Sequence, residues 1–148
     1  MRVRGILLAA VTIAFIPVLG AFQPPIGAPQ EIVTEEQYAA VMNDLRLSMQ
    51  DAAMNIDATY WEDLGAVSDR MTALFERVQA FWTARQVQPA VDFSAQALVV
   101  TYALGQASGA MSGPRVNQAM TDLRAVCQSC HTEFREEVGD GYRIKPGA

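Results

Sequence analysis

The sequence has few of the side chains from which enzyme active sites are usually built. Its 148 residues include one histidine, two cysteines and one lysine, Lys145. They form no set of nucleophile and general base, so the sequence does not predict an enzyme. Acidic residues outnumber basic ones by 16 to 11, which gives a formal net charge of −5. This balance argues against binding to nucleic acid or to an anionic membrane surface, and a charge-steered partner protein would be basic.

The N-terminus has the pattern of a secretory signal. Two arginines precede an uncharged apolar run over residues 5–19. The run is shorter than the roughly 20 residues of a membrane-spanning helix, which favours a cleaved signal over a retained anchor. We expect residues 1–20 to be removed on export to the periplasm, with no stable membrane insertion afterwards. Residues 21–33, rich in proline and glycine, are expected to form a flexible lead-in.

Four later stretches have apolar residues at helical spacing. The first begins at Thr34 with a capping-box pattern and ends near Met54. The second has Asp57 as its expected N-cap and a bundle-type apolar stripe over residues 61–82. The third begins at Pro89. Its predicted apolar face consists of Val91, Ala95, Leu98, Tyr102 and Gly105.

The fourth helix is expected from Pro114 to about Val138, followed by an irregular tail over residues 139–148. Four helices of similar length joined by short links predict an all-α fold, an antiparallel up-down-up-down four-helix bundle over residues 34–138.

Both cysteines and the only histidine lie in one short segment of the fourth helix, Cys127-Gln128-Ser129-Cys130-His131. At 100° per residue, all three side chains fall in the same sector as the apolar residues of that helix. C-x-x-C-H is the attachment sequence for c-type haem, in which two thiols bind the porphyrin and the histidine binds the iron. The alternative is a thiol–disulfide redox pair, which usually opens a helix beside a βαβ pattern.

The position of this motif on the last helix resembles the class II cytochromes c, the cytochrome c′ superfamily. The resemblance includes Phe134-Arg135, where an aromatic and then a basic residue are common in the family. It implies an exported four-helix bundle with one covalently bound haem c. It also implies either of two functions: low-spin iron with a methionine ligand, suited to electron transfer, or five-coordinate iron that binds NO or CO.

Met42 is the expected distal ligand. It lies on the inward face of the first helix, about 12 Å from its start, whereas His131 is expected about 10 Å from the end of the fourth helix. The resemblance to the low-spin branch also points to Met42, and the alternative is an ordinary core residue beside an open distal site. The leading prediction is therefore an electron carrier that serves redox partner proteins.

Other residues of the haem environment follow from the resemblance. A basic residue is common four positions before the distal site, but this chain has Tyr38. Arg46 and Arg124 are the candidate partners of the haem propionates, and Arg135 is a candidate neighbour of the imidazole or a propionate. Members of the family often form homodimers, but the sequence does not identify a contacting face.

Overall fold

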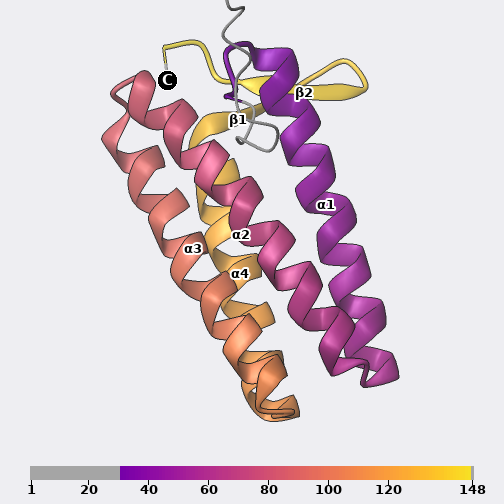
Figure 1. The fold of residues 1–148 in the computed structure, drawn as a ribbon. Coiled ribbons are helices and arrows are strands. Elements are labelled where there is room, and N and C mark those ends of the chain that lie inside the picture. The colour runs from indigo at the N-terminus through magenta and orange to yellow at the C-terminus, as the bar shows by residue number, and fades with distance from the viewer. Residues whose placement is uncertain (1–30, 148) are drawn as a thin grey trace, which may run out of the picture.

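The computed structural model describes residues 31–147, which form four helices and a terminal β-hairpin (Figure 1). The helices are α1 (Glu35–Ala58), α2 (Trp61–Ala84), α3 (Gln88–Gly109) and α4 (Gly113–Phe134). They run alternately down and up, so the all-α antiparallel bundle is confirmed. The predicted signal segment and residues 21–30 of the predicted lead-in lie outside the described residues.

The capping box at the start of α1 is present. The Gln37 backbone N–H donates to Thr34 Oγ1 at 3.2 Å, and the Thr34 N–H donates to Gln37 Oε1 at 3.1 Å. The predicted end of this helix was wrong, because α1 continues to Ala58 and is closed by Thr59 in a left-handed conformation, φ 56°. Asp57 therefore lies within α1 and is not the N-cap of α2, a position that Tyr60 occupies.

The fourth helix is shorter than predicted, and the tail is not irregular. After Phe134 the backbone becomes extended, and β1 (Arg135–Val138) pairs antiparallel with β2 (Gly141–Ile144). A two-residue turn joins them, with Gly139 at φ +58°, a conformation that glycine adopts without steric cost. The Lys145 backbone N–H donates to the Phe134 carbonyl at 2.9 Å, so the hairpin folds back onto the end of α4.

The second and third helices pack closely through small side chains. A Cβ atom added to Gly105 would lie 3.1 Å from Ser68 Oγ, and the Ser68 hydroxyl donates to the Thr101 carbonyl at 2.6 Å. The apolar face predicted for α3 was wrong at Tyr102, which is 66% exposed, whereas Val91 and Leu98 are partly buried against the core. The buried residues of α3 are small or hydroxylated apart from one leucine: Ala90, Ser94, Ala97, Thr101, Leu104, Ala107 and Ser108.

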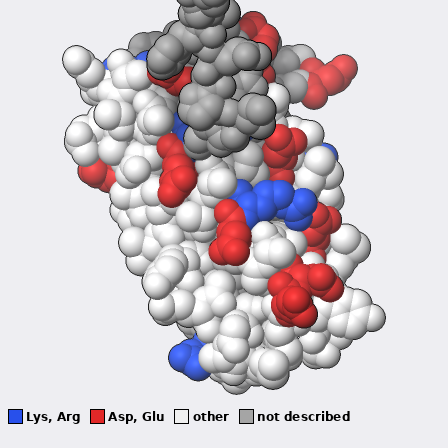
Figure 2. Space-filling model, in the orientation of Figure 1, with Lys and Arg blue, Asp and Glu red and all other residues white. Residues whose placement is uncertain are grey.

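The four helices do not close into an evenly packed ring. Backbone packing joins α1 to α2, α2 to α3 and α3 to α4, but within residues 31–147 no comparable packing joins α1 to α4. On the side of the bundle that faces the viewer in Figure 1, charged side chains lie mainly over α1 and α2 (Figure 2). None of the described helices has the length and hydropathy of a membrane span.

Candidate functional site: a cavity between the first and fourth helices

A cavity of about 440 Å³ occupies the side of the bundle where α1 and α4 are not packed together. Its size is within the range of small-molecule and cofactor sites. All four helices contribute to its walls, but most of the lining comes from α1 and α4. The lining residues are Tyr38, Met42, Leu45, Arg46 and Met49 of α1, Phe75 and Val78 of α2, Phe93, Ser94 and Ala97 of α3, and Arg124, Val126, Cys127, Gln128, Cys130 and His131 of α4.

The α4 wall contains the whole cysteine–histidine cluster. Cys127, Cys130 and His131 are half-buried and line the cavity together, because residues three and four apart on a helix share a face. Both thiols are free. The position of these side chains on the inner face of the last helix is the one that the helical spacing predicts.

The electrostatic environment of this wall favours uncharged side chains. Burial raises the pKa of the Cys127 thiol. Burial and the negative charges of Cys127 and Glu133 raise the pKa of Cys130 to about 11. Burial, assisted by the positive charge of Arg135, lowers the pKa of His131. A neutral imidazole is the form that binds a metal ion, so the site holds His131 ready as a ligand near neutral pH.

The α1 wall places Met42 in the same cavity as His131. Because α4 ends at Phe134, His131 is only about 4.5 Å from the helix end, and the depth expected from a longer helix was overestimated by four residues. Tyr38 also lines the cavity, one helical turn before Met42. Burial, with a smaller contribution from the negative charge of Cys130, raises the pKa of Tyr38.

Two arginines line the cavity from opposite walls, Arg46 on α1 and Arg124 on α4. Arg46 is one turn from Met42 along α1, and Arg124 is one turn from Cys127 along α4. Both arginines are displaced along their helices away from the hairpin end of the bundle. The Arg46 guanidinium is already oriented within α1, since it donates to Asn43 Oδ1 at 3.0 Å and to Gln50 Oε1 at 3.2 Å. These two cations make that part of the cavity suitable for carboxylate groups.

Two of the candidate residues from the sequence do not line the cavity. Phe134 is buried in an aromatic cluster, where its ring centroid lies 5.4 Å from that of Trp82 and 6.4 Å from that of Phe93. The Arg135 guanidinium lies 4.0 Å from the centre of the Tyr142 ring in the hairpin. Arg135 is nevertheless close enough to His131 for its charge to affect the imidazole.

Sequence reasoning missed the contribution of α3. Phe93, Ser94 and Ala97 form the part of the cavity wall that comes from this helix. Ser94 and Ala97 follow the small-residue face of α3, which periodicity of large apolar residues does not identify. Met49 of α1 also lines the cavity.

The residues present fit a covalently attached haem. The cavity is mainly apolar, its α4 wall offers two thiols and a neutral imidazole, and two arginines from facing walls can neutralise carboxylates. A haem needs these features: an apolar enclosure, attachment points, an axial nitrogen and cations for its propionates.

Comparison with solved structures identifies a similar fold. A cytochrome c′, described as having an unusual ligand-controlled dimer dissociation and solved at 1.8 Å, superposes with a TM-score of 0.57. The alignment has 16% sequence identity and covers 75% of this chain and 94% of the cytochrome c′ chain. No family model matches the sequence, and the comparison with curated proteins gave no match. The chain therefore has the four-helix-bundle fold of a cytochrome c′.

Proposed function

We propose that this chain is an exported c-type cytochrome that holds one haem c in the cavity between α1 and α4. The observation that carries the proposal is the convergence of Cys127, Cys130 and His131 on an apolar cavity in a bundle with the cytochrome c′ fold. The haem would supply an iron that can exchange one electron or bind a small gas. Export to the periplasm agrees with covalent attachment, which normally takes place outside the cytoplasm.

Each wall has a distinct role in this proposal. Cys127 and Cys130 would hold the haem through two thioether links, and His131 would supply an imidazole nitrogen to its iron. Arg46 and Arg124 would neutralise the haem propionates. Arg135 contributes a positive charge beside the proximal imidazole. Phe134 supports this arrangement from the aromatic core rather than from the cavity wall.

Two functions share this cofactor, and different observations favour them. The likeness to a cytochrome c′ supports binding of NO or CO at an open distal site better than it supports electron transfer. The position of Met42 in the cavity favours the electron carrier, in which a methionine ligand keeps the iron low-spin. In the gas-binding protein, Met42 would be an unligated wall of the distal site.

Optical spectra with and without carbon monoxide separate these functions. The holoprotein would be made with haem-attachment machinery and compared with Met42→Ala and with Met49→Ala, a matched change on the same wall. A high-spin ferric protein that binds carbon monoxide rapidly supports the gas-binding function. A low-spin protein that binds carbon monoxide only after Met42→Ala, and not after Met49→Ala, supports the electron carrier. A colourless protein contradicts both.

A thiol–disulfide redox function is less consistent with the site. Reactive cysteines need a lowered pKa, because the thiolate is the nucleophile. Here burial raises the pKa of both thiols, that of Cys130 to about 11. Alkylation of free thiols in the purified protein tests this alternative, since two modifiable cysteines would support it and two thioether-linked cysteines would not react.

Assembly into a homodimer belongs to the same proposal. The similar cytochrome c′ is described as a dimer whose dissociation is controlled by a ligand. Sedimentation of the ferrous protein with and without carbon monoxide would test whether this chain dimerises and whether a gas ligand changes its mass.

A further inference from the structure

The position of α1 strongly affects the width of the cavity, because within residues 31–147 little backbone packing joins α1 to α4. Its backbone packs along α2, and its beginning also contacts β2. The contacts that hold α1 on α2 therefore decide how far the α1 wall, with Met42, lies from the α4 wall, with His131.

Tyr38 provides a partly buried polar contact between α1 and α2. The indole Nε1–H of Trp82 donates to the Tyr38 hydroxyl at 3.2 Å. The Tyr38 ring stacks on Phe81 with 4.4 Å between centroids and meets Trp82 edge-on at 5.6 Å. Trp82 and Phe81 are 0% and 1% exposed. The surrounding core holds both rings in place, so they form a rigid packing site for the Tyr38 side chain.

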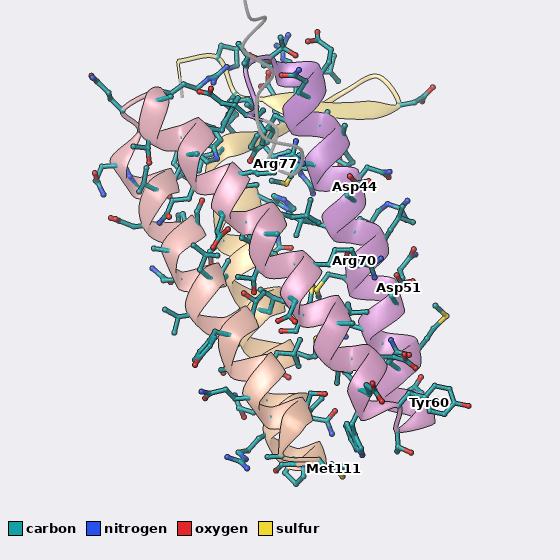
Figure 3. All side chains as sticks on the ribbon, in the orientation of Figure 1. Asp44, Asp51, Tyr60, Arg70, Arg77 and Met111 are labelled. Atoms are coloured by element: carbon teal, nitrogen blue, oxygen red, sulfur yellow. The ribbon has the colours of Figure 1, made fainter. Side chains whose placement is uncertain are left out.

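This packing site of Tyr38 lies one helical turn from Met42. Tyr38 and Met42 point from the same face of α1 into the cavity, and a helix transmits a displacement with little change over one turn of about 5.4 Å. A second polar link between α1 and α2 is the Asp51–Arg70 ion pair at 2.8 Å, which Figure 3 shows well away from the hairpin end. Both its side chains are exposed, so it constrains α1 only weakly.

We infer that Tyr38 is the positioning residue for Met42. Its hydrogen bond with Trp82 and its stack on Phe81 hold the first turns of α1 against α2, and thereby set the approach of Met42 to the haem iron. The inference rests on the proposed function, because it concerns the distal side of a bound haem. It also gives a role to Tyr38, where the family resemblance leads one to expect a basic residue.

The test uses the holoprotein and two readouts, the low-spin fraction of the ferric form and the rate of carbon monoxide association with the ferrous form. Tyr38→Phe keeps the ring but removes the acceptor for the Trp82 indole. We expect the association rate to increase at least about fivefold, the size associated with losing one hydrogen bond. The low-spin fraction should fall wherever the parent protein has one.

Two controls separate positioning from lost stability. Asp51→Asn removes the charge of the Asp51–Arg70 ion pair, about 20 Å further along α1. Val116→Ala removes buried volume about 22 Å from His131 on α4. Neither should change the association rate by more than about twofold, a difference smaller than that expected for one hydrogen bond.

Trp82→Phe provides a second route to the same result, because it removes the donor and leaves Tyr38 in place. Its effect and that of Tyr38→Phe should be non-additive in the double variant. The inference is overturned if a coloured Tyr38→Phe protein binds carbon monoxide no faster than Val116→Ala of equal unfolding free energy. A colourless parent protein instead contradicts the proposed function, so the two failures are distinguishable.

Discussion

The α2–α3 side of the bundle and the α1–α4 side are built from different side chains. Between α2 and α3, Gly105 approaches Ser68 closely, and buried hydroxyls donate to backbone carbonyls, as from Ser68 to Thr101. Between α1 and α4, large apolar side chains such as Met42 and Met49 line a cavity of about 440 Å³. Small residues bring backbones together and leave no space, whereas the larger residues here surround a space that they do not fill.

This difference separates structural from functional positions in one small fold. A closely packed interface resists any change in volume, because neighbouring atoms cannot move away at low cost. An interface around a cavity tolerates larger side chains, but these side chains reduce the space for the cofactor. The two sides should therefore respond in opposite ways to the same substitution.

The largest effect is expected from removing the thiols of the cavity. Cys127→Ala combined with Cys130→Ala should abolish covalent haem attachment, because no other cysteine exists to form a thioether. Haem staining after denaturing electrophoresis measures the loss. Ser129→Ala, an exposed change between the two cysteines, should retain full staining. Covalent haem in the double variant would contradict the proposed attachment.

The same double variant should loosen one side of the bundle only. Without haem, α1 has little packing on α4 within the described residues, so its amides should exchange faster with solvent than in the holoprotein. Amides of α2 and α3 should keep more of their protection, because these two helices pack closely on each other. Equal loss of protection in all four helices would contradict the distinction between the two sides.

The cofactor-binding segment was predictable because its signal is local. Cys127, Cys130 and His131 lie within a stretch of five consecutive residues, so helical geometry alone places them on one face. The opposite wall depended on long-range packing, and Met42 was inferred through an assumed bundle together with the family resemblance. Phe134 was a candidate for the haem environment through the family resemblance, and the structure places it in the aromatic core beside Trp82 and next to the cavity-lining Phe93.

Other features gave weaker signals in the sequence. The buried face of α3 consists mainly of alanine, serine and threonine, which hydrophobic periodicity weights poorly, and this led to the wrong assignment of Tyr102. The hairpin was missed because its strands have four residues each. The charged residues of β1 are also compatible with a continuation of the preceding helix. Only the pairing of β1 with β2 in the folded chain makes this segment a strand.

Gly105→Val should destabilise the closely packed side. Its Cβ would lie 3.1 Å from Ser68 Oγ, whose own hydrogen bond to the Thr101 carbonyl prevents an easy rearrangement. We expect the free energy of unfolding to fall by about 1–3 kcal/mol, as for other overpacked interiors. Urea denaturation measures it. Gly65→Ala, where a Cβ meets nothing within 4 Å, should instead stabilise α2 by about 0.5–1 kcal/mol.

Ala97→Leu and Ala107→Leu make the same change at two buried positions of α3, one at the cavity and one away from it. Ala97 lines the cavity, whereas Ala107 is buried outside it. Ala107→Leu should lower the unfolding free energy by about 1–3 kcal/mol. Ala97→Leu should cost the haem-free protein less than about 1 kcal/mol, because the added methyl groups enter the cavity.

The haem content of these two variants should show the opposite order. Ala97→Leu reduces the space for the cofactor, so less haem should be attached per protein than in Ala107→Leu. The ratio of haem absorbance to protein concentration measures it. Equal haem content combined with equal destabilisation would mean that the two positions are packed alike.

The smallest effect concerns the pH dependence of stability in the haem-free protein. Burial, assisted by the charge of Arg135, lowers the pKa of His131 below its ordinary value of 6.5. As the pH falls through 6.5, the unfolded chain binds a proton that the folded chain does not yet bind, so unfolding becomes more favourable. The contribution of His131 to stability is therefore present above that pH and is lost as the pH falls toward the lower folded-state pKa.

Urea denaturation between about pH 7.5 and pH 5 should show a steeper loss of stability for the parent than for His131→Gln, because only the parent imidazole titrates in that range. Arg135→Gln removes the smaller of the two causes and should give an intermediate slope. Identical slopes for the parent and His131→Gln would mean that the imidazole is solvated as in the unfolded chain, and would contradict its burial in the cavity wall.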